Sequence, residues 1–109
     1  MMIVNAVFHI SKFEKSNGYK LLDGRVLQDI NLADKLILLK NINIHYYNNY
    51  CDNLLGLKIN DDEPYVEIQI NKIYSYGAYW ESLPAGMSAR LECYCEIDYL
   101  TDLILCKIM

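Results

Sequence analysis

Several features that define common protein classes are missing from this chain of 109 residues. No run of about 18 apolar residues occurs, so the sequence predicts no membrane-spanning helix. The N-terminus has no basic region followed by a long apolar run, which predicts a cytoplasmic rather than a secreted protein. There is no repeat, low-complexity stretch or linker, so residues 1–109 are expected to form one domain.

Metal-binding motifs are also missing, because the four cysteines and two histidines lack the spacing of ligands. A zinc site usually combines pairs of C-x-x-C spacing with nearby histidines, whereas His9 and His45 are far apart in sequence. Cys93 and Cys95 share one face of a predicted strand. We expect them to be small buried hydrophobes rather than disulfide partners. No metal and no cofactor are expected.

No catalytic constellation can be identified in the sequence. Cys51 and His45 are the one close pair of nucleophile and base, and no third group is present to orient the base. Glu92 and Glu96 would lie roughly 13 Å apart on one strand face, which is too far for the usual paired-carboxylate mechanisms. The chain is therefore predicted not to be an enzyme, with a small enzyme of unrecognised type as the disfavoured alternative.

What the chain does contain is the patterning of an all-β protein. Apolar residues make up 53% of it, and many are the β-branched and aromatic types that favour strands. No segment keeps a 3.6-residue apolar period over three turns. Several short strands separated by turns predict a small closed, antiparallel-rich β-barrel of six or seven strands. The predicted strands cover 3–10, 19–27, 35–44, 65–73, 88–99 and 103–108, with a short extra strand at 54–59.

Turn signals separate these strands. Asn17-Gly18 predicts a tight hairpin turn, and Asp23-Gly24 predicts a bulge or bend within the returning strand. Residues 28–34 and 75–86 are expected to be connections, the second with an aromatic tip. In two strands, apolar and polar residues alternate, which predicts one buried and one solvated face. The inward positions are Val66, Ile68, Ile70, Leu91, Cys93, Cys95 and Ile97.

A series of glycines and apolar residues follows the order of a known barrel. The chain reads Phe8-His9-Ile10, Gly24-Arg25-Val26, Asp34-Lys35-Leu36, an alternating strand at 66–73, and Pro84-Ala85-Gly86-Met87. Over nearly the whole chain this resembles the second domain of translational GTPases such as elongation factor Tu. The resemblance implies a β-barrel that associates with transfer RNA or the ribosome. The GTPase's own phosphate loop, G-x-x-x-x-G-K-[ST], is missing.

Two aromatic clusters are candidate partner-binding sites, because Tyr and Trp provide large, rigid contact surfaces. One lies in the segment 45–53 and the other in 75–86. The candidate binding residues are Tyr46, Tyr47, Tyr50, Tyr76, Tyr79 and Trp80. The alternative is that several of these side chains pack over an end of the barrel and close it.

The charge of the chain bears on the kind of partner. A net charge of −4 and a pI of about 5.0 lower the expectation of nucleic acid binding and favour a basic partner. Asp61, Asp62 and Glu63 are candidate acidic contacts, together with Glu92, Glu96 and Asp98, and ordinary solubility is the alternative. The leading hypothesis is a protein-binding module, for example an immunity-type protein that caps a basic bacterial toxin. The other hypotheses are an RNA- or ribosome-associated barrel and self-association through an edge strand.

Overall fold

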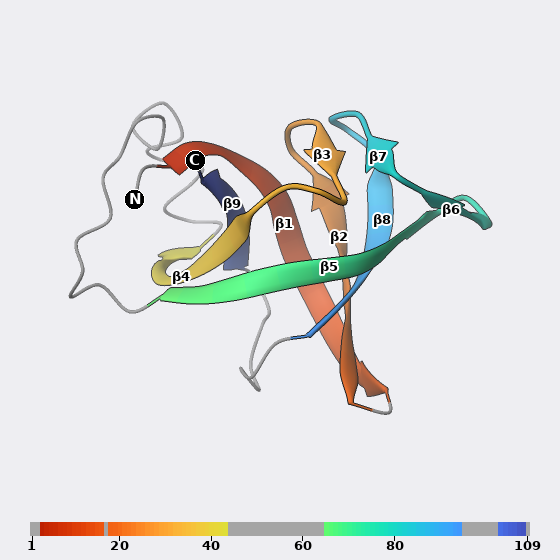
Figure 1. Ribbon diagram of the computed structural model, residues 1–109, viewed down its shortest axis with the longest axis horizontal. Helices are drawn as coiled ribbons and strands as arrows, with labels where there is room; N and C mark the ends of the chain where they lie inside the picture. Colours follow the sequence, from red (N-terminus) through yellow and green to blue (C-terminus); the bar gives the residue numbers. More distant parts are fainter. Residues whose placement is uncertain (1–2, 17, 44–64, 95–102, 109) are drawn as a thin grey trace.

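The computed structural model describes residues 3–16, 18–43, 65–94 and 103–108 (Figure 1). These residues form strands and turns, and among them is no helix that could cross a membrane. The strands are β1 (Ile3–Ser16), β2 (Tyr19–Val26), β3 (Ile30–Asn31), β4 (Leu36–Asn43), β5 (Tyr65–Ser75), β6 (Ala78–Trp80), β7 (Ser82–Leu83), β8 (Ser88–Tyr94) and β9 (Leu103–Ile108). The expected extra strand at 54–59 lies outside the described residues.

Six of the strands form a closed antiparallel barrel. Their order around the wall is β1, β2, β8, β5, β4 and β9, and β9 pairs again with β1. Closure depends on β5, which pairs with β4 near its start and with β8 further along. The prediction of a small all-β barrel is confirmed, with β6 as one additional strand that extends from β5 at the right of Figure 1.

One cluster of apolar side chains fills the barrel. Phe8, Ile73 and Leu91 have no exposed surface and belong to this cluster. Because burial of each large aliphatic or aromatic side chain contributes about 1.5–3 kcal/mol, the cluster is the main source of stability. The predicted inward positions are confirmed for Ile68, Ile70, Leu91 and Cys93; Val66 is partly buried against the cluster, and Cys95 and Ile97 lie outside the described residues.

A two-stranded sheet of β3 and β7 closes the core at one end. Ile30 pairs with Leu83, and both side chains are almost fully buried in the main cluster. The turn after β3 is held by Asp34, whose carboxylate accepts a hydrogen bond from the Asn31 amide at 2.9 Å and lies 3.0 Å from the Lys107 ammonium. The expected connections at 28–34 and 75–86 do contain turns, but they also contain the short strands β3, β6 and β7, which the sequence pattern does not predict. Strands of two residues are too short to produce an alternating pattern.

The β1–β2 hairpin is longer than the sequence pattern predicts. Ser16 pairs with Tyr19 across the predicted tight turn, so β1 continues well past residue 10. A bulge at Ser11 lies opposite Gly24, and β2 keeps a regular register with β8. The predicted irregularity is thus in the facing strand rather than in β2 itself. Gly24 is required there, since a Cβ would overlap the His9 carbonyl oxygen and lie 2.9 Å from the Phe8 ring.

Candidate partner-binding surface

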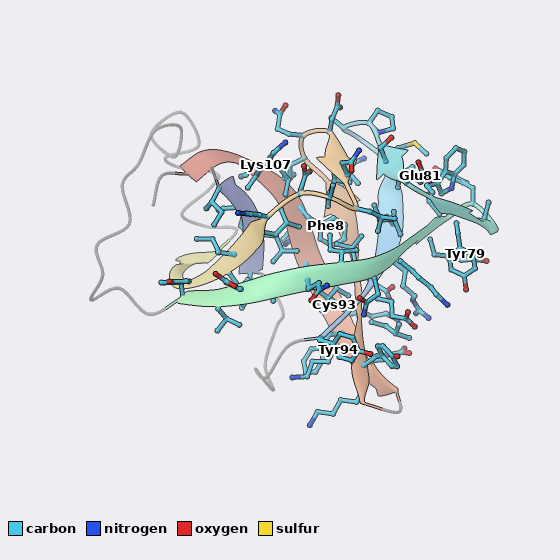
Figure 2. All side chains as sticks on the ribbon, viewed as in Figure 1. Phe8, Tyr79, Glu81, Cys93, Tyr94 and Lys107 are labelled. Atoms are coloured by element: carbon cyan, nitrogen blue, oxygen red, sulfur yellow. The ribbon has the colours of Figure 1, made fainter. Side chains whose placement is uncertain are left out.

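Three of the predicted binding residues lie together on the β5–β6 hairpin. Tyr76, Tyr79 and Trp80 are 79%, 67% and 42% exposed, and the neighbouring Tyr74 is 41% exposed. We call these four residues the aromatic surface. Figure 2 shows Tyr79, the middle residue of β6, on the part of the hairpin that extends from the barrel. The other predicted binding residues lie outside the described residues; they are Tyr46, Tyr47, Tyr50, Asp61, Asp62 and Glu63.

The turn of this hairpin has an unusual residue at its tip. Ser75 pairs with Ala78, which leaves a loop of two residues, Tyr76 and Gly77, with φ angles of 49° and 79°. Positive φ at both positions is the type I′ arrangement, for which Asn-Gly is the preferred sequence. A tyrosine in this conformation is destabilising by about 1–2 kcal/mol. Since Tyr76 is mostly exposed, its burial does not offset that cost.

Hydrogen bonds hold the hairpin firmly against the barrel. The Trp80 indole Nε1 donates to the Ser75 carbonyl at 2.9 Å, and the Ser75 hydroxyl donates to the Ser88 carbonyl on β8 at 2.6 Å. The rings of Tyr74 and Tyr79 meet edge to face, with 5.4 Å between their centroids. The aromatic surface is therefore presented on a braced element, which reduces the entropy that a partner would lose by ordering it.

A bulge in β5 decides which side chains share the outer face with these aromatics. The register between β5 and β8 shifts between Ile70 and Lys72, so that Asn71 is the extra residue. The alternating pattern predicts that Asn71 is solvated like Glu67 and Gln69, but Asn71 is partly buried. After the bulge, Lys72 and Tyr74 are the exposed positions instead.

Cross-strand register assembles two rows of side chains on this outer face. One row runs through Lys12, Asp23, Arg90, Tyr74 and Tyr79 on five neighbouring strands. The second row consists of Glu14, Leu21, Glu92 and Lys72. The rows bring together charges and aromatic rings that are far apart in sequence.

Ion pairs neutralise the centre of this face. The Arg90 guanidinium donates two hydrogen bonds to the Asp23 carboxylate, at 2.7 and 2.9 Å, and lies 3.9 Å from Glu14. The hydrogen bonds to Asp23 raise the pKa of Arg90 above its usual value, and a guanidinium is in any case charged at physiological pH. Such bidentate geometry fixes the position of Arg90 beside Tyr74.

A shallow pocket of about 430 Å³ lies between the two rows. The Lys72 ammonium lies 5.3 Å from the centroid of the Tyr79 ring, within the range of a cation–π contact. Glu92 lies directly opposite Lys72 in the β5–β8 register. The lining residues are Leu21, Lys72, Tyr74, Tyr79, Arg90 and Glu92.

The described residues give no indication of a metal or a reactive thiol. They contain no group of three or more His, Cys, Asp or Glu side chains that could hold a metal ion. Cys106 is fully buried, and burial raises the pKa of its thiol to about 12. A thiol in that environment is a poor nucleophile at neutral pH. Cys51 and His45, the pair considered for catalysis, lie outside the described residues, as does Glu96.

Sequence reasoning finds Glu92 as a candidate acidic contact, because the alternating pattern of 88–99 places it on a solvated face, but it misses Lys72 and Arg90. The bulge at Asn71 could have been found from the break in alternation between Ile70 and Ile73, whereas the register between β2 and β8 has no local signal. Comparisons of the chain with protein families, curated proteins and solved structures gave no match.

Proposed function

We propose that this chain is a non-enzymatic protein-binding module that contacts its partner through the aromatic surface. The observation that carries the proposal is the exposure of Tyr74, Tyr76, Tyr79 and Trp80 together on one braced hairpin. Aromatic side chains of this kind are enriched at binding hot spots, and clustered exposed apolar groups on a monomer are often functional.

The folding of the barrel does not account for this exposure. Ile30 and Leu83 close the core beside the hairpin, so the aromatic side chains are not needed to cover it. Tyr76 occupies a left-handed position that asparagine would occupy at lower cost. Residues that keep an unfavourable backbone conformation without a packing benefit are candidates for a role in function.

A basic protein is the partner class that the charge of the chain favours. Segments 44–64 and 95–102 contain seven of the fourteen Asp and Glu residues and one of the ten Lys and Arg residues. Acidic segments of this composition attract a basic partner and accelerate its association. An immunity-type protein that caps a cationic bacterial toxin is one concrete form of this proposal.

The test is a pull-down from the native host with the tagged full chain, in which half of each sample is treated with RNase. We expect one stoichiometric basic protein in both halves, lost with the Tyr76→Asn/Tyr79→Ser variant. Tyr65→Ala is the matched control, because Tyr65 is a 37% exposed tyrosine at the opposite end of β5. If the double variant captures the partner as well as the wild type does, the assignment of the aromatic surface is refuted.

RNA binding is the second candidate, and it is supported by a specific observation. The described residues contain nine Lys and Arg but only seven Asp and Glu, in contrast to the acidic chain as a whole. Exposed aromatic rings beside cations are typical of platforms on which single-stranded bases stack. The resemblance to the second domain of elongation factor Tu adds transfer RNA and the ribosome as targets.

RNA binding predicts an affinity for a single-stranded RNA oligonucleotide that falls steeply with salt, because phosphate contacts release counterions. Fluorescence anisotropy with a labelled oligonucleotide at low and at physiological salt measures this directly. If no RNA binding is detected at low salt, RNA binding is refuted as a function of this surface. Ribosomal proteins that leave the pull-down after RNase treatment would favour it over the protein-binding proposal.

A further inference from the structure

We infer that the pocket between Tyr74, Tyr79 and Glu92 holds a basic side chain, arginine or lysine, of the protein partner. This inference rests on the proposed function and specifies what the aromatic surface recognises. It is carried by the geometry of the two rings, by a cation already bound to one of them, and by the charges around the pocket.

The first step concerns the rings. Tyr74 and Tyr79 are inclined at 63° with 5.4 Å between their centroids, so they form two walls of a corner rather than a flat stack. Because the contact is edge to face, a cation in this corner lies over the electron-rich face of one ring. Leu21, which also lines the pocket, can cover the methylene groups of a long basic side chain.

The second step is that the chain's own Lys72 already places its ammonium over one of these rings, Tyr79. Lys72 lies opposite Glu92 in the register, yet its ammonium lies over the Tyr79 ring at 5.3 Å. The ring therefore accepts a cation within the folded chain. Lys72 is exposed and flexible enough to be displaced by a cation that makes more contacts.

The third step is the charge that remains once Lys72 is displaced. The other cation of the pocket, Arg90, is paired with Asp23 and Glu14. Glu92 takes part in neither of these pairs. A partner arginine would thus meet two tyrosine rings and one carboxylate, which together favour a planar cation that can both stack and donate hydrogen bonds.

The experiment is an NMR titration of the ¹⁵N-labelled full chain with N-acetyl-arginine methylamide, with N-acetyl-glutamate methylamide as the anionic counterpart. We expect shifts of residues 72–80 and 90–92 with the arginine probe and not with the glutamate probe. Tyr79→Ala should lower the affinity for the arginine probe by about two- to fivefold, which is the loss expected for one exposed cation–π contact. Glu92→Gln should also lower this affinity. Lys72→Met should raise it, because it removes the competing ammonium.

Matched controls separate loss of the pocket from loss of the fold. Tyr65→Ala and Glu67→Gln change an exposed tyrosine and an exposed carboxylate near the start of β5 and should leave the titration unchanged. Thermal melts of each variant confirm that it is folded. Equal shifts with both probes, or stronger shifts with the glutamate probe, would overturn the inference.

Failure of this inference can be told from failure of the proposed function. If the pull-down depends on Tyr76 and Tyr79 but the arginine probe does not bind, the surface binds proteins and the cation pocket is refuted. If the arginine probe binds selectively and Glu92→Gln weakens it, the pocket is supported even when the partner is captured elsewhere on the chain.

Discussion

The close approach of β1 and β2 at Gly24 makes a sharp prediction about stability. In Gly24→Ala, the added Cβ would overlap the His9 carbonyl oxygen. It would also lie 2.8 Å from the His9 carbonyl carbon and 2.9 Å from the Phe8 ring. Two of these obstacles are backbone atoms that cannot rotate away. Overpacking usually costs about 1–3 kcal/mol, and an obstacle in the backbone places this case near 3 kcal/mol.

The assay is denaturant and thermal unfolding of the purified variant. For a domain of this size, 3 kcal/mol corresponds to a fall in Tm of about 12–24 °C. Gly18→Ala is the control, because no atom lies within 4 Å of its added Cβ and only its φ of +87° opposes the change; we expect about 1–2 kcal/mol. A Gly24→Ala variant within about 0.5 kcal/mol of the wild type would refute the described packing of β1 over β2.

Two further predictions concern the hairpin and the core. Tyr76→Asn should stabilise the chain by about 0.5–1 kcal/mol in thermal unfolding while it weakens partner capture, because asparagine suits the left-handed turn position; a loss of stability would contradict the turn assignment. Below pH 9 both folded and unfolded Cys106 are protonated; above pH 9 only the unfolded thiol ionises, until the folded pKa of about 12 is reached. The stability advantage of the wild type over Cys106→Ala should therefore shrink as pH rises from 9 towards 12 in denaturant titrations, and a constant difference would show that the thiol is not buried.

The sequence allowed the barrel to be predicted because its main elements carry strong local signals. The Asn17-Gly18 turn and the alternation around Ile68 and Leu91 each specify an element without reference to the rest of the chain. The short strands β3 and β7 have no such signal, since their pairing becomes favourable only when Ile30 and Leu83 meet at the core.

The candidate surface could be predicted only in part, for a related reason. Aromatic composition drew attention to Tyr76, Tyr79 and Trp80, and composition is visible in any sequence. Arg90 reaches its partner Asp23 across a separation of 67 residues, through a register that no local pattern reveals. A single extra residue at Asn71 then exchanges which positions of β5 are exposed. The bulge does leave a trace in the sequence, because the apolar positions step by two from Ile68 to Ile70 and then by three to Ile73.

The central claim is that a protein partner covers the aromatic surface, and Trp80 can report on it directly. Trp80 is the only tryptophan of the chain and is 42% exposed. In a ¹⁵N-labelled chain it gives one indole N–H signal, which can be followed as the unlabelled captured partner is added. We predict that this signal shifts and that its hydrogen exchange slows at one equivalent of partner. A complex that forms at full stoichiometry while the indole signal and its exchange stay unchanged would contradict the claim.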